Sequence, residues 1–404
     1  MSQSRTRARA EDVARAAYGK LVAMIASRSG DIMAAEDALS DAFVAALRTW
    51  PERGLPENPE AWLLTVAKNR RIDQARKASR LVLTDEVAEM DHIPARAEDD
   101  PLDDRLKLLF VCAHPAIDPG IRTPLMLQTV LGLEAADIAR AFLVSPTAMA
   151  QRLVRAKKKI KSAGIPFVVP DAAHYPDRME AVLEAVYGAY AVDWLEGAGD
   201  LSHEAFFLST ILADLAPTHA EALGLTALIG FVEARRAARV RHGVLVPVPE
   251  QDTSLWDAEL AARSAAVLTR ASALRQMGRF QLEAAIQSVH AARAATGRTD
   301  WRALSQLYAG LLQRHPTIGS AVGRAAVVAE DAGPAEGLRL LTRIEFADLS
   351  RYQPAHAVRA HCLAGLGRFA DAAEAYDKAI SLCTDGPSRR WLEQKKSALR
   401  KKIS

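Results

Sequence analysis

Polar and basic side chains gather on one predicted helical face near the middle of the chain. Ser145 is a favoured N-cap and Pro146 suits a first helical position, so a helix is predicted to begin here. Its exposed side carries, at helical spacing, Thr147, Gln151, Arg152, Arg155 and Lys158. Such side chains can hydrogen-bond base edges near the helix start and phosphates farther along. The pattern indicates DNA binding, and the alternative is a packed helix with a solvated basic end.

The segment before this helix predicts a second helix that crosses it. Ile138 and Ala139 are apolar and small where the two helices of a helix-turn-helix must approach closely. Residues 133–160 combine an N-cap, a small residue at the helix crossing and a second helix that continues with basic residues. This combination is the strongest local indication of function in the sequence, and it favours a helix-turn-helix.

A second basic run lies nearer the N-terminus. Six lysines and arginines fall between Lys68 and Arg80, against one acid, Asp73. The preceding interval 51–59 holds three prolines and a glycine, so it is predicted to be a shaped loop and not continuous helix. Beside Trp50, such a loop can hold an unstacked base of single-stranded DNA, whereas the basic helix alone could equally be a solvated face.

The sequence lacks the constellations that are typical of enzymes. It has no GxGxxG, Walker, GxSxG or HExxH motif, and its ten histidines are scattered singly. The cysteines, Cys112, Cys362 and Cys383, form no CxxC pair, so neither a disulfide framework nor a zinc site is implied. We therefore expect no catalysis, no metal and no cofactor.

Helices must position the candidate DNA-binding residues. Almost every long segment has apolar residues at helical spacing and is rich in Ala, Leu, Arg and Glu, which predicts an all-α protein. Helices are expected over 12–29, 34–49 and 59–80, and in a second small unit over 105–164. Between these units, residues 81–104 hold nine acids and one arginine and are predicted to form an acidic linker.

From residue 175 onward, helix is predicted to follow helix, apart from one extended interruption at 242–256. The segment 367–380 has the small and aromatic spacing of a tetratricopeptide second helix, through Gly367, Phe369, Ala372, Tyr376 and Ala379. Weaker echoes occur at 278–280 and 304–316. Helix pairs of this kind cover one another's apolar faces by stacking, so a helical-repeat domain is predicted.

Length and composition indicate how many domains the chain forms and whether it enters a membrane. A chain of 404 residues, half of them apolar, is predicted to form two or three folded domains. The longest stretches without a charged side chain have eleven residues, whereas a membrane-spanning helix needs about 20. The N-terminus lacks the apolar region of a signal peptide. We expect a cytoplasmic protein with no membrane segment.

Three segments in chain order, 35–43, 61–73 and 138–156, resemble the successive signatures of extracytoplasmic-function (group IV) sigma factors. The remainder is similar to the helical C-terminal extension of a subgroup of these factors, through 280–291, Gln251 and Asp252 with Trp256, and the last tetratricopeptide-like repeat. Together these similarities cover nearly the whole chain.

The resemblance implies partners and site residues. The clamp helices of the beta-prime subunit of core RNA polymerase would bind Glu36, Asp37, Asp41, Phe43 and Leu47. The minus-ten promoter element would be melted and read by Trp50, Asn58, Trp62, Lys68, Asn69, Arg70, Arg71, Asp73, Arg76 and Lys77. The minus-thirty-five element would be read in the major groove by Ser145, Thr147, Ala148, Gln151, Arg152, Arg155 and Lys158. The beta flap of the polymerase is a further expected partner.

We therefore predict a sigma factor with region two at 10–80, an acidic linker at 81–104, region four at 105–166 and a regulatory helical-repeat domain at 171–404. The last domain is expected to control activity through contacts with the sigma domains or the polymerase. The alternative is a helix-turn-helix regulator with a helical-repeat sensor and no polymerase contact. A helical-repeat enzyme or scaffold fits least well. The segment 36–77 discriminates, because only a sigma factor requires it.

Overall fold

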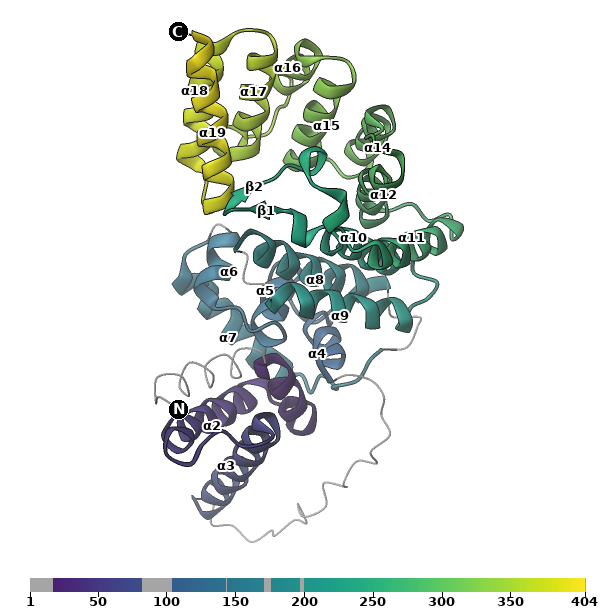
Figure 1. Cartoon of the computed structure of the whole chain (residues 1–404). Coiled ribbons are helices and arrows are strands. Elements are labelled where there is room, and N and C mark those ends of the chain that lie inside the picture. Colours follow the sequence, from purple (N-terminus) through teal and green to yellow (C-terminus); the bar gives the residue numbers. More distant parts are fainter. Residues whose placement is uncertain (1–16, 82–103, 143, 171–175, 197–199, 404) are drawn as a thin grey trace. The chain divides into compact units, whose positions relative to one another are not determined.

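A computed structural model describes residues 17–81, 104–142, 144–170, 176–196 and 200–403 (Figure 1). These residues are almost entirely helical, which confirms the all-α prediction. Within these ranges, strands occur in one antiparallel hairpin, formed by β1 (Val240–Arg241) and β2 (Val244–Leu245). The predicted linker lies outside the described residues between positions 82 and 103.

Contacts divide the chain into two compact units. The first contains residues up to Trp194 together with 198–208, and the second contains 195–197 and 209–404. Helix α9 (Asp200–Leu215) belongs to both.

The first unit is built from helices with short connections. They are a helical segment at 17–29, α2 (Ile32–Arg53), α3 (Pro59–Leu81), α4 (Asp104–Cys112), α5 (Pro119–Thr129), α6 (Ala135–Ala141), α7 (Pro146–Ser162), α8 (Pro176–Glu196) and the start of α9. Helix α2 packs against α3, and α5 packs against α4, α6 and α7.

Helix α2 is longer than the sequence predicts. The Asp31 carboxylate accepts a hydrogen bond from the Ala34 N–H at 3.1 Å and caps the helix start. The helix continues through Pro51 and ends at Arg53, and the C-cap residue Gly54 has a φ of 85°. The predicted loop is therefore wrong at 51–53, because a proline in the last turn removes only the bond to the carbonyl of Leu47, an exposed residue.

Helix α4 is covered on every side. Its residues Arg105 to Cys112 are all buried, including the charged Arg105 and Lys107. Arg105 forms an ion pair with Glu204 of α9, and its guanidinium lies 5.0 Å from the ring centroid of Phe207. The first half of α9 thus completes the surroundings of α4.

The second unit continues from the end of α9 with helices that pack on their neighbours in the chain. They are α10 (Ala220–Glu233), α11 (Ala258–Ala273), α12 (Arg279–Ala291), α13 (Arg293–Thr296), α14 (Trp301–Arg314), α15 (Ile318–Asp331), α16 (Pro334–Thr342), α17 (Gln353–Gly365), α18 (Phe369–Leu382) and α19 (Gly386–Ile403). Short 3-10 turns lie at η2 (Arg236–Ala238), η3 (Val248–Glu250), η4 (Thr253–Leu255) and η5 (Leu349–Arg351).

The interruption expected at 242–256 is an ordered segment held by distant helices. Gln251 accepts a hydrogen bond from the Trp256 indole at 3.2 Å, and the Arg293 guanidinium lies 5.0 Å from the Trp256 ring. At the hairpin, Arg390 of α19 donates to the carbonyl of Gly243 at 2.7 Å. Figure 1 shows β2 beside α19. The last helix of this unit therefore contacts the hairpin that follows α10 in the chain.

Candidate nucleic-acid and polymerase interface

Helix α7 begins as the sequence predicts. The Ser145 hydroxyl accepts a hydrogen bond from the Ala148 N–H at 3.2 Å, and Pro146 occupies the first turn. The first N–H groups of a helix have no partner within the helix. The Ser145 hydroxyl supplies one with an acceptor, and Pro146 has no N–H that would need one. The helix start is therefore fixed locally, independently of any distant contact.

The apolar side of α7 is buried and most of its candidate reading side is exposed. Met149, Leu153 and Ile160 are buried. The candidate residues that are exposed are Ser145, Thr147, Gln151, Arg152, Arg155 and Lys158, while Ala148 is half-buried. Six of the seven expected minus-thirty-five residues are thus accessible to a partner.

Helix α6 packs against α7 through the small crossing residues expected there. Ile138 is 1% and Ala139 0% exposed. The connection is short, and the N–H of Val144 donates to the carbonyl of Ala139 at 3.0 Å. Leu143 lies outside the described residues. The tight connection fixes the direction in which α7 leaves α6.

Two residues of α7 were not anticipated. Val154 is 40% exposed, although it is apolar, and it lies one turn beyond Gln151 on the exposed side. Lys157 is buried, although it stands in a run of basic residues. Periodicity could have indicated the burial of Lys157, since it lies between Leu153 and Ile160 on the apolar side of the helix at helical spacing.

Lys157 is buried because it binds a carboxylate of α2. Its ammonium group lies 2.6 Å and 2.7 Å from the two carboxylate oxygens of Glu36. The Lys157 side chain is 6% and the Glu36 side chain 18% exposed. The ammonium group of Lys157 therefore faces α2 and not the exposed side of α7.

A second ion pair joins the same two helices. The Lys161 ammonium group lies 2.6 Å from a carboxylate oxygen of Asp31. Hydrogen bonds from Lys161 and from the Ala34 N–H outweigh burial and lower the pKa of Asp31. Burial instead raises the pKa of Glu36, in spite of the attraction of Lys157.

The remaining expected polymerase-binding residues of α2 lie at or near the surface. Asp37, Asp41 and Leu47 are exposed, and Phe43 is half-buried. Val44 was not anticipated, yet its side chain is 48% exposed between them. This outer face combines carboxylates with apolar side chains, which suits a protein partner.

The expected minus-ten residues have mixed surroundings. Trp50 is 2% exposed and meets Trp62 edge to face, with ring centroids 5.5 Å apart. Asn58 is exposed, but its side chain accepts a hydrogen bond from the Ala61 N–H at 3.0 Å and caps α3. Trp50 was expected to help hold a base and is corrected to a packing residue, because the apolar surface of its indole is already covered.

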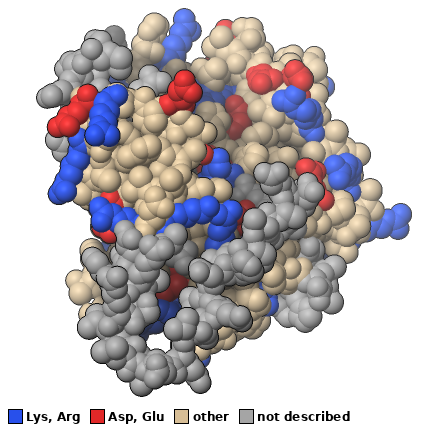
Figure 2. Space-filling view, turned by 90° about the horizontal axis from the view of Figure 1, so that it is seen from below, with Lys and Arg blue, Asp and Glu red and all other residues tan. Residues whose placement is uncertain are grey.

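The basic residues of α3 provide the accessible groups of this region. Lys68, Asn69 and Arg70 are exposed. Four further expected residues, whose side chains lie outside the described part, are Arg71, Asp73, Arg76 and Lys77. On the face seen from below (Figure 2), Lys and Arg lie in several separate groups with acidic side chains beside them.

Family models match two parts of the chain. Residues 10–81 match Sigma-70 region 2, and residues 178–272 match a family of unknown function, DUF6596. The uncharacterized protein R00370 of Rhizobium meliloti (strain 1021) is 36% identical over 373 residues, which cover 89% of this chain and 88% of that protein. The chain belongs to the sigma-70 family. No solved structure matches it significantly.

The region-two match of this sigma-70 factor contains α2 and α3. It supports binding of core RNA polymerase and a role in transcription. Sigma-70 membership also points to a transcription factor and not to an enzyme.

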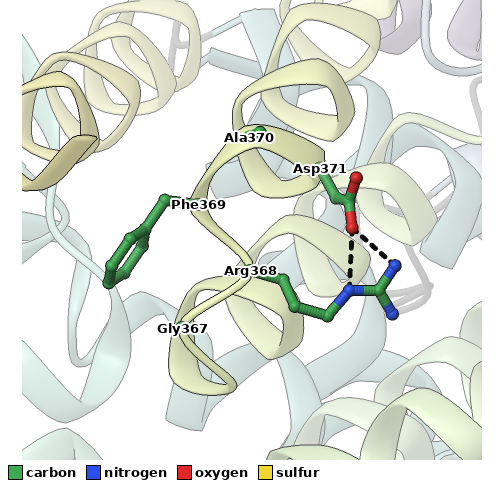
Figure 3. A pocket seen from close by; sticks show the side chains of 5 residues that line it. All are labelled: Gly367, Arg368, Phe369, Ala370 and Asp371. Atoms are coloured by element: carbon green, nitrogen blue, oxygen red, sulfur yellow. Dashed lines mark hydrogen bonds and ion pairs between the residues drawn. The ribbon is translucent and has the colours of Figure 1, made fainter.

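A pocket in the second unit is lined by Gly367 to Asp371 (Figure 3). There Arg368 donates to the Asp371 carboxylate at 2.7 Å, while Phe369 points away from this pair. Among the described residues, no three His, Cys, Asp or Glu side chains gather as a metal site. In the same part of the chain, each helix is too short or too polar to cross a bilayer.

Proposed function

We propose that this protein is an extracytoplasmic-function sigma factor that directs RNA polymerase to promoters with defined minus-ten and minus-thirty-five elements. Region two would bind core polymerase and the minus-ten element. A helix-turn-helix formed by α6 and α7 would bind the minus-thirty-five element. The protein would act in the cytoplasm, where polymerase and promoter meet.

The observation that carries this proposal is the exposed row on α7, in a chain whose N-terminal part matches Sigma-70 region 2. Thr147, Gln151 and Arg152 lie in the first two turns, where a recognition helix contacts base edges. Arg155 and Lys158 follow on the exposed side and would contact phosphates.

Polymerase binding would use the outer face of α2. Asp37 and Asp41 lie four residues apart and share one side of the helix, with the exposed Val44 and Leu47 beside it. A partner surface with basic and apolar residues, as expected for the beta-prime clamp helices, would be complementary to this face.

Single-stranded DNA at the minus-ten element would contact Lys68, Asn69 and Arg70, supported by the four expected residues farther along α3. Trp62 is half-buried and offers part of an aromatic face beside the loop 54–58. Aromatic stacking combined with basic side chains is the general means of holding unpaired bases.

Run-off transcription with purified core polymerase tests this function. Core polymerase lacking any other sigma factor should produce promoter-dependent transcripts only when this protein is added. Binding of duplex DNA without core-dependent initiation would instead support the helix-turn-helix regulator with a sensor domain.

The polymerase contact has its own test. Changing both Asp37 and Asp41 to lysine should weaken core binding at least tenfold, because two attractive charges become repulsive. A charge-matched control replaces Glu345 and Asp348, two exposed acids of the second unit, by lysine. Equal affinity of the two double variants for core polymerase would remove α2 as the interface.

We also propose that the C-terminal helices form a tetratricopeptide-like domain that controls activity. In α18, Ala372, Tyr376 and Ala379 are buried in one apolar cluster with Leu363 of α17. The turn between these helices contains Gly367 at φ 74°, a conformation that suits glycine. Removing residues after Leu215 should change promoter-dependent transcription several-fold, and unchanged transcription would reject this control.

A further inference from the structure

The last helix of the second unit is strongly basic. Between Gly386 and Ile403, the sequence of α19 has seven lysines and arginines and one acid, Glu393. Arg390, Gln394 and Ser397 are exposed, and their spacing of four and three residues places them on one side of the helix. Side chains of these three types donate hydrogen bonds to phosphate oxygens in protein–DNA complexes. This side of α19 therefore suits an anionic partner.

The hairpin of the second unit has an exposed basic turn. Strand residues Arg241 and Val244 pair, so His242 and Gly243 form the turn, with φ angles of 51° and 75°. Two positive φ angles are typical of a type I′ turn, where glycine and asparagine are preferred. Both Arg241 and His242 are exposed. The turn thus presents a guanidinium and an imidazole to solvent, although glycine would adopt the backbone of position 242 more easily.

Arg390 joins this turn to the start of α19. Its Nε donates a hydrogen bond to the Gly243 carbonyl at 2.7 Å, across 147 positions of sequence. A guanidinium nitrogen of Arg390 is 3.1 Å from the place of an added Gly243 Cβ, and Figure 1 shows β2 beside α19. The turn and the helix therefore form one surface, which we call the basic corner. Its members, all exposed, are Arg241, His242, Arg389, Arg390, Gln394 and Ser397.

The arginines of the basic corner are not neutralised by ion pairs. Among the described residues, Arg241, Arg389 and Arg390 form none. Arg389 and Arg390 donate instead to backbone carbonyls, those of Cys383 and Gly243. A guanidinium has five N–H groups, so both arginines retain donors for a partner. The corner thus keeps positive charge and unused donors at the surface.

Two acids of the adjoining segment are engaged by other groups. Glu250 pairs with Lys395 at 3.1 Å. Asp252 accepts hydrogen bonds from the hydroxyl and the N–H of Ser254, at 2.7 Å and 3.0 Å. These bonds, and to a smaller extent the attraction of Arg241, lower the pKa of Asp252. Neither carboxylate forms an ion pair with an arginine of the corner.

Charge density favours duplex DNA as the partner. The row from Arg390 to Ser397 is about 10 Å long, at about 1.5 Å per residue. Duplex DNA carries one negative charge per about 1.7 Å of its axis, hence about six charges over this length. An extended acidic peptide advances about 3.3 Å per residue and offers at most about three charges. DNA therefore presents about twice the opposite charge to the corner.

The composition of the corner distinguishes further between partners. No large apolar side chain is exposed on the described part of α19, up to Leu399, and on the hairpin Val240 is 37% exposed. Protein interfaces have an apolar centre, and single-stranded nucleic acid is held by exposed aromatic rings. Trp391 of α19 is half-buried, and the Lys395 ammonium lies 5.5 Å from its ring centroid. A duplex, contacted through its phosphates, fits these groups better than either.

We propose that the basic corner binds the phosphate backbone of duplex DNA without regard to base sequence. This contact goes beyond the proposed function, because it requires neither polymerase nor a promoter element. It would give the second unit a direct contact with DNA, in addition to the contacts proposed for α3 and α7.

Binding of the full-length protein to a random-sequence duplex of about 40 base pairs, at several salt concentrations, tests the proposal. Every protein carries Arg155→Ala and Lys158→Ala, which removes two phosphate contacts proposed for α7. On this background, the corner variant carries Arg241→Gln, Arg389→Gln and Arg390→Gln. The parent protein carries the background changes alone.

A control variant loses the same charge elsewhere in the second unit, through Arg270→Gln, Arg302→Gln and Arg359→Gln at exposed positions. The corner variant should bind at least about tenfold more weakly than the parent at about 100 mM salt. Its slope of log K against log salt should be smaller by about two to three, since each lost contact contributes about 0.9. The control should match the parent in both quantities. Equal affinities and slopes of the two variants would overturn the proposal.

Cross-linking locates the DNA and does not depend on the folding of the corner variant. A photoreactive group is attached to a cysteine introduced by Gln394→Cys, in the corner, or by Glu374→Cys, at an exposed position of α18. The three native cysteines are buried. Labelled duplex should cross-link to the first protein and not to the second. Equal yields, or no yield at position 394, would contradict binding at the corner.

Competitors of equal total charge identify the class of partner. Unlabelled duplex should suppress the cross-link at concentrations at least about tenfold lower than poly-glutamate or single-stranded RNA. Equally effective suppression by either of these would indicate an acidic protein or a single strand as the partner and would overturn the assignment to duplex DNA. Polymerase is absent from these measurements, so their outcome is independent of the transcription test of the proposed function.

Discussion

Two neighbouring lysines of α7 have opposite surroundings. Lys158 is exposed, whereas the side chain of Lys157 is 6% exposed against Glu36. Residue type is the same at both positions, so the difference comes from the side of the helix on which each lies. A role cannot be assigned to a basic residue from its type alone.

Gly19 is required by the close approach to Val130. Gly19→Ala should lower the free energy of unfolding of the first unit by about 1–3 kcal/mol, because the new methyl group overlaps the Val130 carbonyl. The gain in helix propensity, about 1 kcal/mol, is too small to offset this overlap. Urea unfolding followed by circular dichroism measures the change.

Gly188 of α8 provides the matched control. The nearest atom to an added Cβ there is a Leu127 methyl carbon at 4.0 Å, an ordinary contact. Gly188→Ala should therefore leave stability unchanged or raise it by up to about 1 kcal/mol. A loss of the same size in both variants would contradict the specific contact between Gly19 and Val130.

His290 of α12 should make the second unit sensitive to acid. Burial, helped by Arg235 and Arg293, lowers the pKa of His290 from 6.5 to about 4. Between these values the unfolded chain binds a proton that the folded chain does not, so stability falls as the pH falls. The contribution between pH 7.5 and pH 5 is about 2 kcal/mol.

Urea unfolding of the wild type and of His290→Gln at these two pH values measures this contribution. The variant lacks the titrating group and should lose about 2 kcal/mol less on acidification than the wild type. The ring of Trp301, whose centroid is 6.3 Å from that of His290, offers a local fluorescence signal. Identical acid sensitivity of both proteins would exclude His290 as the cause.

At the scale of elements, the proposed DNA-binding role of α7 predicts that base reading and phosphate attraction fall on different parts of the helix. Arg152 lies nearly two turns from the helix start, and Lys158 lies nearly two turns farther on. A bidentate contact to a base discriminates by about 1–3 kcal/mol, whereas a phosphate contact adds affinity for every sequence and increases the salt dependence.

Arg152→Ala should therefore relax the preference at about one position of the minus-thirty-five element, whereas Lys158→Ala should weaken binding to all sites alike. Binding of both variants to a DNA library with a randomised element, at two salt concentrations, distinguishes these effects. If only Lys158→Ala changed the sequence preference, the assignment of base-reading and phosphate-binding residues along α7 would be reversed.

At the scale of the whole molecule, the first compact unit extends beyond the predicted region four. The predicted boundary between residues 166 and 171 stays a prediction, but α8 and the first half of α9 group with α4 to α7. Glu204 and Phe207 of α9 both contact the buried Arg105 of α4. The helices at the start of the extension are therefore part of the support of α4.

The position of a truncation should consequently decide whether the sigma region stays folded. A protein ending at Leu215 keeps the partners of Arg105 and should unfold cooperatively on heating. A protein ending at Pro170 lacks Glu204 and Phe207, which contact the buried Arg105, and uncovers α4, so it should melt at least about 5 °C lower. Differential scanning calorimetry measures both, and equal melting temperatures would show that α8 and α9 do not support α4.

The sequence by itself determined the local features of this protein. Helix type follows from the spacing of apolar residues, and the start of α7 follows from Ser145 and Pro146, because capping involves groups only three residues apart. The exposed row of Arg152, Arg155 and Lys158 was predictable for the same reason, since the period of a helix fixes which side chains share a face.

Only the tertiary structure decided which helical faces meet. Lys157 and Glu36 are 121 residues apart, and no pattern in either helix specifies the other as its partner. Trp50 adjoins a proline-rich loop in sequence, yet its ring is buried against Trp62 because α2 continues through Pro51. Periodicity gives the buried side of a helix, whereas the neighbour that covers it depends on packing between segments that the sequence places far apart.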